Sequence, residues 1–123
     1  MNLVAPIYRT IQSSAQAVAL LGSPLRVFSF GETQNQDVAK PYVVWQNIGG
    51  QPENYLGSRP EIQSHSVQVD IYGDSAKQVR DVASAILEPI EVEAYVQNWG
   101  GESRDPETQD FRISFDLDWF VHR

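Results

Sequence analysis

The sequence contains no cysteine. This absence excludes disulfide bonds, thiolate zinc sites and a cysteine nucleophile, and it suits a cytosolic protein. No stretch approaches the ~20 consecutive apolar residues of a membrane-spanning helix, so we expect no contact with a membrane. Polar residues at 9, 12–14 and 16 interrupt the N-terminal segment, which therefore lacks the apolar core of a signal peptide.

Basic residues are scarce as well. Nine Lys and Arg stand against sixteen Asp and Glu, which gives a net charge of −7 and a pI of about 4.6. Non-specific binding of DNA depends on Lys and Arg that neutralise phosphates, so a tight grip on DNA is not expected. A length of 123 residues with 41% hydrophobic residues predicts one globular domain, residues 1–123, around a single core.

Two segments carry the apolar spacing of a helix. Residues 3–21 have an apolar stripe at four-residue intervals, and the polar residues 12–14 can divide it into two helices. The second segment is 75–87, where Ser75 and Gln78 form a capping box in front of another apolar stripe. A proline two residues beyond this segment is expected to limit the helix.

Five segments have the composition or the alternation of strands. The clearest is 111–121, in which apolar and polar residues alternate, and 62–72 alternates in the same way with His65 on the apolar side. The other predicted strands are 26–30, 42–48 (ended by Gly49 and Gly50) and 94–99, and the polar stretches 33–40, 51–60 and 100–110 are predicted loops. The fold class is α+β: a mostly antiparallel sheet with two helices packed on one face and a polar second face.

The order of these parts resembles the tail terminator, or tail-completion, proteins of tailed bacteriophages of the siphophage type, which join head and tail. The resemblance covers nearly the whole chain, although no single piece of it is diagnostic. The segments that carry it are Pro-Ile-Tyr at 6–8, Ala-Val-Ala-Leu-Leu-Gly at 17–22, Pro-Tyr-Val-Val-Trp-Gln at 41–46, Ser-Val-Gln-Val-Asp-Ile-Tyr-Gly at 66–73 and Asp-Pro-Glu-Thr-Gln-Asp-Phe-Arg-Ile-Ser-Phe-Asp-Leu-Asp-Trp at 105–119.

The resemblance implies a structural protein of the virion, located at the head–tail interface. Such proteins form a ring, usually a hexamer, that caps the tail tube, ends its growth and joins the tail to the head connector. The implied partners are copies of the same chain, the tail tube protein and the connector protein, and DNA passes through the ring without specific binding. Neighbouring ring-forming parts, such as a connector or tube subunit, share this logic and stay open as alternatives.

Residues for chemistry are few, and no catalytic, cofactor-binding or metal-binding residue is predicted. The two histidines, His65 and His122, have no second ligand beside them, and His65 is expected at a strand end. Asp116 and Asp118 could hold a hard cation with added loop oxygens, but they are more typical of a solvated strand face. A small enzyme or ligand-binding domain with an unrecognised site is the alternative from a different class.

A closed ring needs two different patches on each subunit, because each contact joins unlike surfaces. We expect the three polar loops to be mobile in the free chain and to become ordered on assembly, and an exposed sheet edge could add a strand from a neighbour. The candidate contacts with the ring or its partners are Glu53, Tyr55, Arg59, Trp99, Arg104 and Asp105. The candidates for the ring's inner wall are Gln68, Asp70, Asp116 and Asp118, whose negative charge would keep DNA from adhering; facing bulk solvent is an equal alternative for them.

Overall fold

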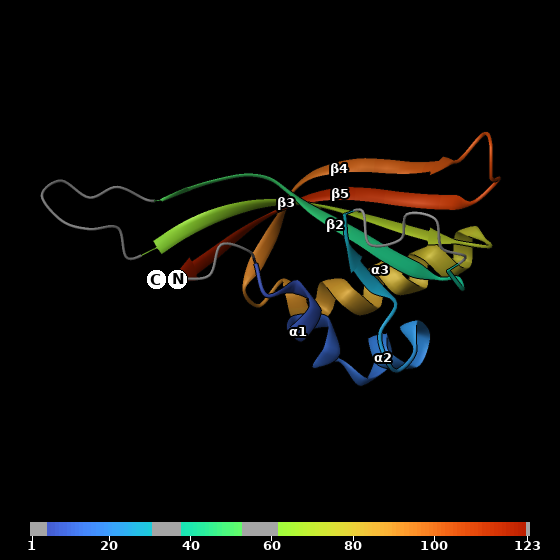
Figure 1. Cartoon of the computed structure of the whole chain (residues 1–123), viewed down its shortest axis with the longest axis horizontal. Helices are drawn as coiled ribbons and strands as arrows, with labels where there is room; N and C mark the ends of the chain where they lie inside the picture. Colours follow the sequence, from blue (N-terminus) through green and yellow to red (C-terminus); the bar gives the residue numbers. More distant parts are fainter. Residues whose placement is uncertain (1–4, 31–37, 53–61, 123) are drawn as a thin grey trace, which may run out of the picture.

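A computed structural model describes residues 5–30, 38–52 and 62–122. They form a five-stranded sheet with the strand order β1-β2-β3-β5-β4, in which only the short β1 runs parallel to its neighbour. Three helices lie together on one side of this sheet, and its other face is uncovered by them (Figure 1). The elements are α1 (Ile7–Gln12), α2 (Ala15–Leu21), β1 (Val27–Ser29), β2 (Tyr42–Pro52), β3 (Ile62–Gly73), α3 (Ala76–Ile90), β4 (Ala94–Arg104) and β5 (Phe111–His122).

The two central strands set the length of the molecule. β3 and β5 pair without interruption from Ile62 opposite His122 to Gly73 opposite Phe111. Successive side chains of a strand point to opposite faces, so this register gathers the apolar residues of both strands on the helix side. Val67, Val69 and Ile71 are fully buried there, as the alternation in the sequence predicts.

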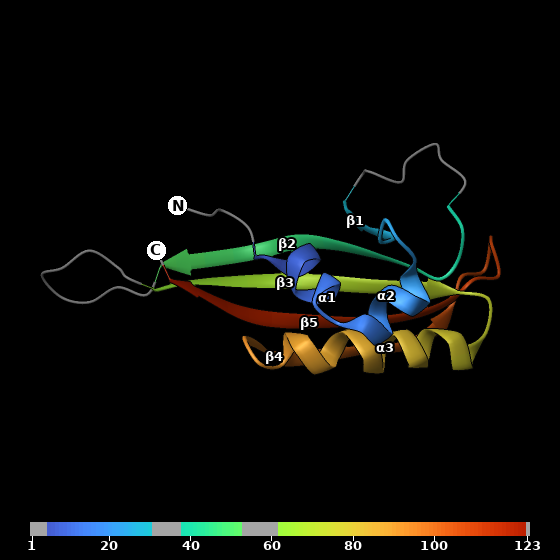
Figure 2. The same cartoon turned by 90° about the horizontal axis from the view of Figure 1, so that it is seen from below.

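Helix α3 runs along the long axis of the sheet, and α1 and α2 lie beside it on the same face (Figure 2). Ser75 caps its first turn by accepting a hydrogen bond from the backbone N–H of Gln78 at 3.1 Å. The Gln78 side chain accepts a hydrogen bond of 2.7 Å from the backbone N–H of Asp74. The predicted capping box is therefore present, but its second bond goes to the residue before the N-cap instead of to the N-cap itself. The helix ends at Ile90, one residue beyond the proline that was expected to limit it.

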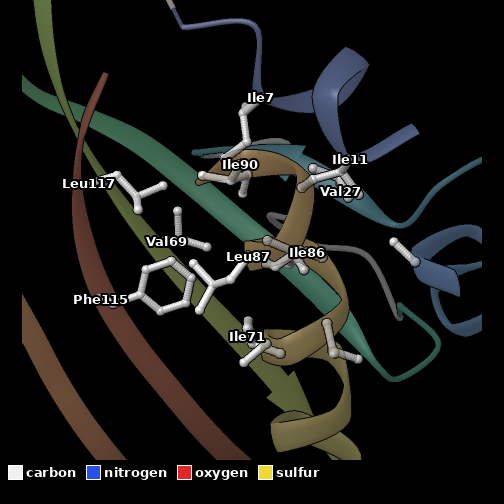
Figure 3. Packing of buried hydrophobic residues seen from close by; sticks show 14 of the residues in the cluster. Ile7, Ile11, Val27, Val69, Ile71, Ile86, Leu87, Ile90, Phe115 and Leu117 are labelled. Atoms are coloured by element: carbon white, nitrogen blue, oxygen red, sulfur yellow. The ribbon is translucent and has the colours of Figure 1, made fainter. Parts of the chain in front are cut away.

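The core lies between α3, α1 and the sheet. Ile86, Leu87 and Ile90 project from α3 between the sheet side chains and Ile7 and Ile11 of α1 (Figure 3). On the sheet side they meet, among others, Phe115 and Leu117 of β5, both with no exposed surface. Burial of apolar surface is the main favourable term in folding, so this single layer fixes how the helices sit on the sheet.

Several expectations about element limits are corrected by the structure. Residues 12–14 do divide the first helical segment, so three helices instead of two cover the sheet. Gly49 and Gly50 do not end the second strand, which continues to Pro52. Gly100–Arg104 belong to β4, so the predicted loop 100–110 shrinks to residues 105–110. Most of the other two predicted loops, 33–40 and 51–60, lies outside the described residues.

No helix within residues 5–30, 38–52 and 62–122 combines the length and the apolar character that crossing a membrane requires.

Candidate functional site

The uncovered face of the sheet carries the four residues predicted for an inner wall. Gln68 lies opposite Asp116 and Asp70 opposite Ser114 in the β3–β5 register, and Asp118 is one rung further along. Gln68 accepts a hydrogen bond from Gln46 at 3.1 Å, and Asp118 accepts one from Ser66 at 3.1 Å. The structure therefore brings the predicted set together in one polar field, which we call the open face.

One end of the open face is built from stacked rings. Tyr42 of β2 stacks on Tyr72 of β3 with ring centroids 5.1 Å apart. The guanidinium of Arg112 in β5 lies over the Tyr72 ring, 5.9 Å from the ring centroid. Two nitrogens of Arg112 donate to one oxygen of Asp70, at 2.8 and 3.1 Å. Burial, helped by the Asp70 charge, raises the pKa of Tyr72. The ion pair with Arg112 balances the negative charge of Asp70.

At the opposite end of the open face the exposed surface is aromatic. Tyr95 of β4 and Phe120 of β5 have ring centroids 5.9 Å apart, with 50% and 39% of their surface exposed. Asp116 and Asp118 lie between the two aromatic ends, and among the described residues neither is within ion-pair distance of a cation. The net negative charge of the open face therefore comes from these two carboxylates.

Two of the predicted contact residues lie on the edge strand β4. Trp99 is 57% exposed on the helix side, with its ring 5.3 Å from that of Phe115. Arg104 ends the strand and lies 4.8 Å over the Phe111 ring. The strand has two bulges, and at the second Gly100 passes so close to Ser114 that an added Cβ would lie 3.1 Å from its carbonyl oxygen. Bulges of this kind protect an exposed edge from unwanted pairing.

Asp105 is occupied by the turn that follows β4. One of its carboxylate oxygens accepts hydrogen bonds from the backbone N–H groups of Glu107, at 2.8 Å, and Thr108, at 3.1 Å. These bonds lower the pKa of the Asp105 carboxyl group, because they favour its charged form. The Asp105 carboxylate thus stabilises the turn. The remaining predicted contacts, Glu53, Tyr55 and Arg59, lie outside the described residues.

An ion pair that sequence reasoning missed ties the β4–β5 turn to the start of β2. Lys40 contacts Asp110, a carboxylate with only 8% exposure, and a second carboxylate, Asp74, lies 3.7 Å from the same amino group. The hydrogen bond to Asp110 is the main reason why the pKa of Lys40 is raised. Nothing local in the sequence indicates this contact, because it joins segments 70 residues apart that only the sheet brings together.

His65 lies inside β3 on the core side, with 3% of its surface exposed, so the expectation of a strand-end position is wrong. Among the described residues its Nε2 finds no hydrogen-bond partner, and burial lowers the pKa of the ring because the charged form loses its hydration. Within the part of the chain that the structure describes, no three His, Asp or Glu side chains are grouped to hold a metal ion.

The buried His65 makes stability depend on pH. Its folded-state pKa lies below the usual 6.5, so the unfolded chain binds a proton first, and stability is lost as pH falls from about 7.5 to 5.5. We expect the urea midpoint to fall over this range, because the free energy of unfolding drops by at most about 1.4 kcal/mol per pH unit. His65→Leu should flatten the dependence of stability on pH, because leucine fills the same buried position with a side chain that does not titrate. An unchanged slope in this variant would contradict the assignment; carboxylates titrate mainly below this range.

The described residues thus present an open polar face with aromatic ends and a bulged edge strand. The family model described as tail completion protein gp17 matches residues 5–122. The chain therefore belongs to this family of phage tail-completion proteins: it is a structural protein of the virion tail and not an enzyme. The resemblance seen in the sequence is confirmed, and the alternative of a small enzyme is not.

Several solved structures share the fold, and two of them can be compared with this chain. One is a chain from the virion of a native gene transfer agent particle, with a TM-score of 0.73, 13% identity, and coverage of 95% of this chain and 92% of that chain. The other is the gp17 protein of bacteriophage SPP1, with a TM-score of 0.55, 11% identity, and coverage of 95% and 86%. At such identities the likeness is one of fold. A search of curated proteins returned no significant match.

Proposed function

We propose that copies of this chain, six in number, form a ring that caps the tail tube, ends its growth and joins the tail to the head connector. The observation that carries the proposal is the match to a tail-completion family over residues 5–122 in a chain whose sheet leaves one long face free of helices. Support also comes from the solved neighbour that is part of a gene transfer agent virion. A capping ring needs such a subunit, with unlike surfaces for its copies, the tube and the connector.

In this ring the open face forms the inner wall. Asp116 and Asp118 then face the DNA that passes through, and Asp70 adds little because Arg112 balances its charge. Like charges repel, so the wall lets the phosphate backbone slide past without binding. In this proposal DNA only passes through the ring, and the stable contacts of the subunit are with other protein subunits.

Electron microscopy of purified chain mixed with isolated tail tubes tests the proposal. We expect rings at one end of each tube and tubes that no longer elongate when tube protein is added. Tubes that elongate normally, or the purified chain bound along the whole length of the tubes, would indicate a tube subunit instead. Rings that bind head connectors but leave tube ends bare would indicate a connector subunit. The protein without tubes serves as the control for self-assembly.

A further inference from the structure

A small hollow lies between the first turns of α3 and the far end of β4. Its volume is about 250 Å³, below the ~300 Å³ at which pockets for small-molecule ligands usually begin. Val79 and Phe111 give it an apolar lining, and Arg80, Glu102 and Arg104 also line it. A space of this size and character suits one apolar side chain with an acidic neighbour.

The arginines at this hollow are unusual in an acidic chain. Three of the nine Lys and Arg are among its lining residues, although the guanidinium of Arg112 is on the open face with Asp70. Arg80 is held by Glu102 and Arg112 by Asp70, so their charges are balanced within the subunit. Arg104, in contrast, has no carboxylate within ion-pair distance among the described residues and rests on the Phe111 ring. The hollow therefore combines apolar surface with one uncompensated cation.

The opposite end of α3 has the complementary character. Val92, in the turn between α3 and β4, is 84% exposed, more than any other large hydrophobic side chain in the described segments. Glu91 and Glu93 flank it, and Glu88 lies one turn earlier, all three exposed. Carboxylates are unfavourable at the negative end of a helix dipole, and α3 has no basic residue in its last turn to offset them. Within the subunit, Glu93 accepts a long hydrogen bond of 3.5 Å from the Thr10 hydroxyl, which leaves the exposure of Val92 and Glu91 unexplained by the fold.

We propose that Val92 of one subunit inserts into the hollow of the next copy, where Glu91 and Glu93 meet Arg104. This inference rests on the proposed ring and names the contact that builds it. The 15 residues of α3 span about 22 Å, so the turn and the hollow lie on opposite sides of the subunit. That placement supplies the two unlike, mutually complementary patches that a head-to-tail ring requires. Arg is also among the residue types that most often dominate the binding energy of an interface, which fits the role proposed for Arg104.

Two single substitutions test the contact from its two sides. Val92→Asp and Arg104→Glu should each raise the protein concentration needed for ring assembly at least about tenfold, measured by sedimentation and on tail tubes. Both side chains are exposed, so thermal unfolding should confirm that the subunit still folds. Lys77→Glu is the matched control: it reverses an exposed charge on α3 outside the hollow and should leave assembly unchanged.

Mixing the two variants gives the sharper result. A Val92→Asp subunit keeps an intact hollow and an Arg104→Glu subunit keeps an intact turn, so one contact can form between them but cannot propagate. We expect each variant alone to be monomeric and a 1:1 mixture to give dimers. A mixture that stays monomeric, or a Val92→Asp variant that assembles like the unchanged protein, overturns this contact while the ring stands. Unchanged protein that assembles neither alone nor on tubes overturns the ring as well.

Discussion

Replacing Phe115 by alanine is expected to lower the free energy of unfolding by about 3–5 kcal/mol. The side chain has no exposed surface and sits among core residues beneath α3, so its removal leaves a cavity that the rigid sheet cannot close (Figure 3). For a domain of this size the melting temperature should fall by more than about 10 °C. Urea and thermal unfolding of the purified chain measure both quantities.

The same strand offers a matched control on its other face. Phe120 is also a phenylalanine of β5, but it lies on the open face, 39% exposed and in contact only with the Tyr95 ring among the aromatic residues described. Phe120→Ala should therefore cost about 1 kcal/mol at most. Equal losses at the two positions would contradict the assignment of the helix side as the only buried face.

The faces of the long strands could be predicted from the sequence, because alternation is a local signal. A strand exposes and buries successive residues in turn, so the apolar series around Val69 and Phe115 marks the core side whichever strands are neighbours. The helix over 75–87 was equally readable, since Ser75 and the apolar stripe lie within a few turns of each other. These elements confirm the α+β class predicted for the chain.

The edge strand was misjudged because its signals are not local. Gly100 and Gly101 have the composition of a turn, and the residues after them are polar. In the structure the glycines form a bulge, where Gly100 packs against Ser114 and Gly101 adopts a φ of 90°. Most of β4 is exposed, so its sequence lacks the apolar–polar alternation that marks a half-buried strand. Only the position of β5 makes this segment a strand.

The candidate site divides in the same way. Gln68, Asp70, Asp116 and Asp118 were predicted to share a face, and they do, because alternation alone places them there. The partners of these residues depend on register between distant strands. The Asp70–Arg112 pair, 42 residues apart, could therefore not be seen in the sequence, and it leaves less negative charge on the open face than the four residues suggest.

The two unbalanced carboxylates of the open face have the largest expected effect on function. Replacing both Asp116 and Asp118 by lysine turns each negative charge into a positive one at the proposed inner wall. Rings assembled from this variant should bind linear duplex DNA that the unchanged ring does not retain. If six or more phosphates are contacted, the affinity should fall by about a thousandfold or more between 50 and 200 mM salt. Gel shift and filter binding at several salt concentrations measure this.

A topological control decides whether the wall is inside the ring. A control variant, Asp81→Lys with Ser84→Lys, places two new cations on α3, on the side of the sheet away from the open face. Preassembled rings with cations in the hole can take up linear DNA by its ends but cannot admit a closed circle, whereas cations elsewhere on the ring bind both forms. We therefore expect the Asp116 and Asp118 variant to retain only linear DNA and the α3 variant to retain both. Equal binding of closed circles by the two variants would place the open face on the outside of the ring, because electrostatic attraction to phosphates does not depend on DNA ends unless the charges are enclosed.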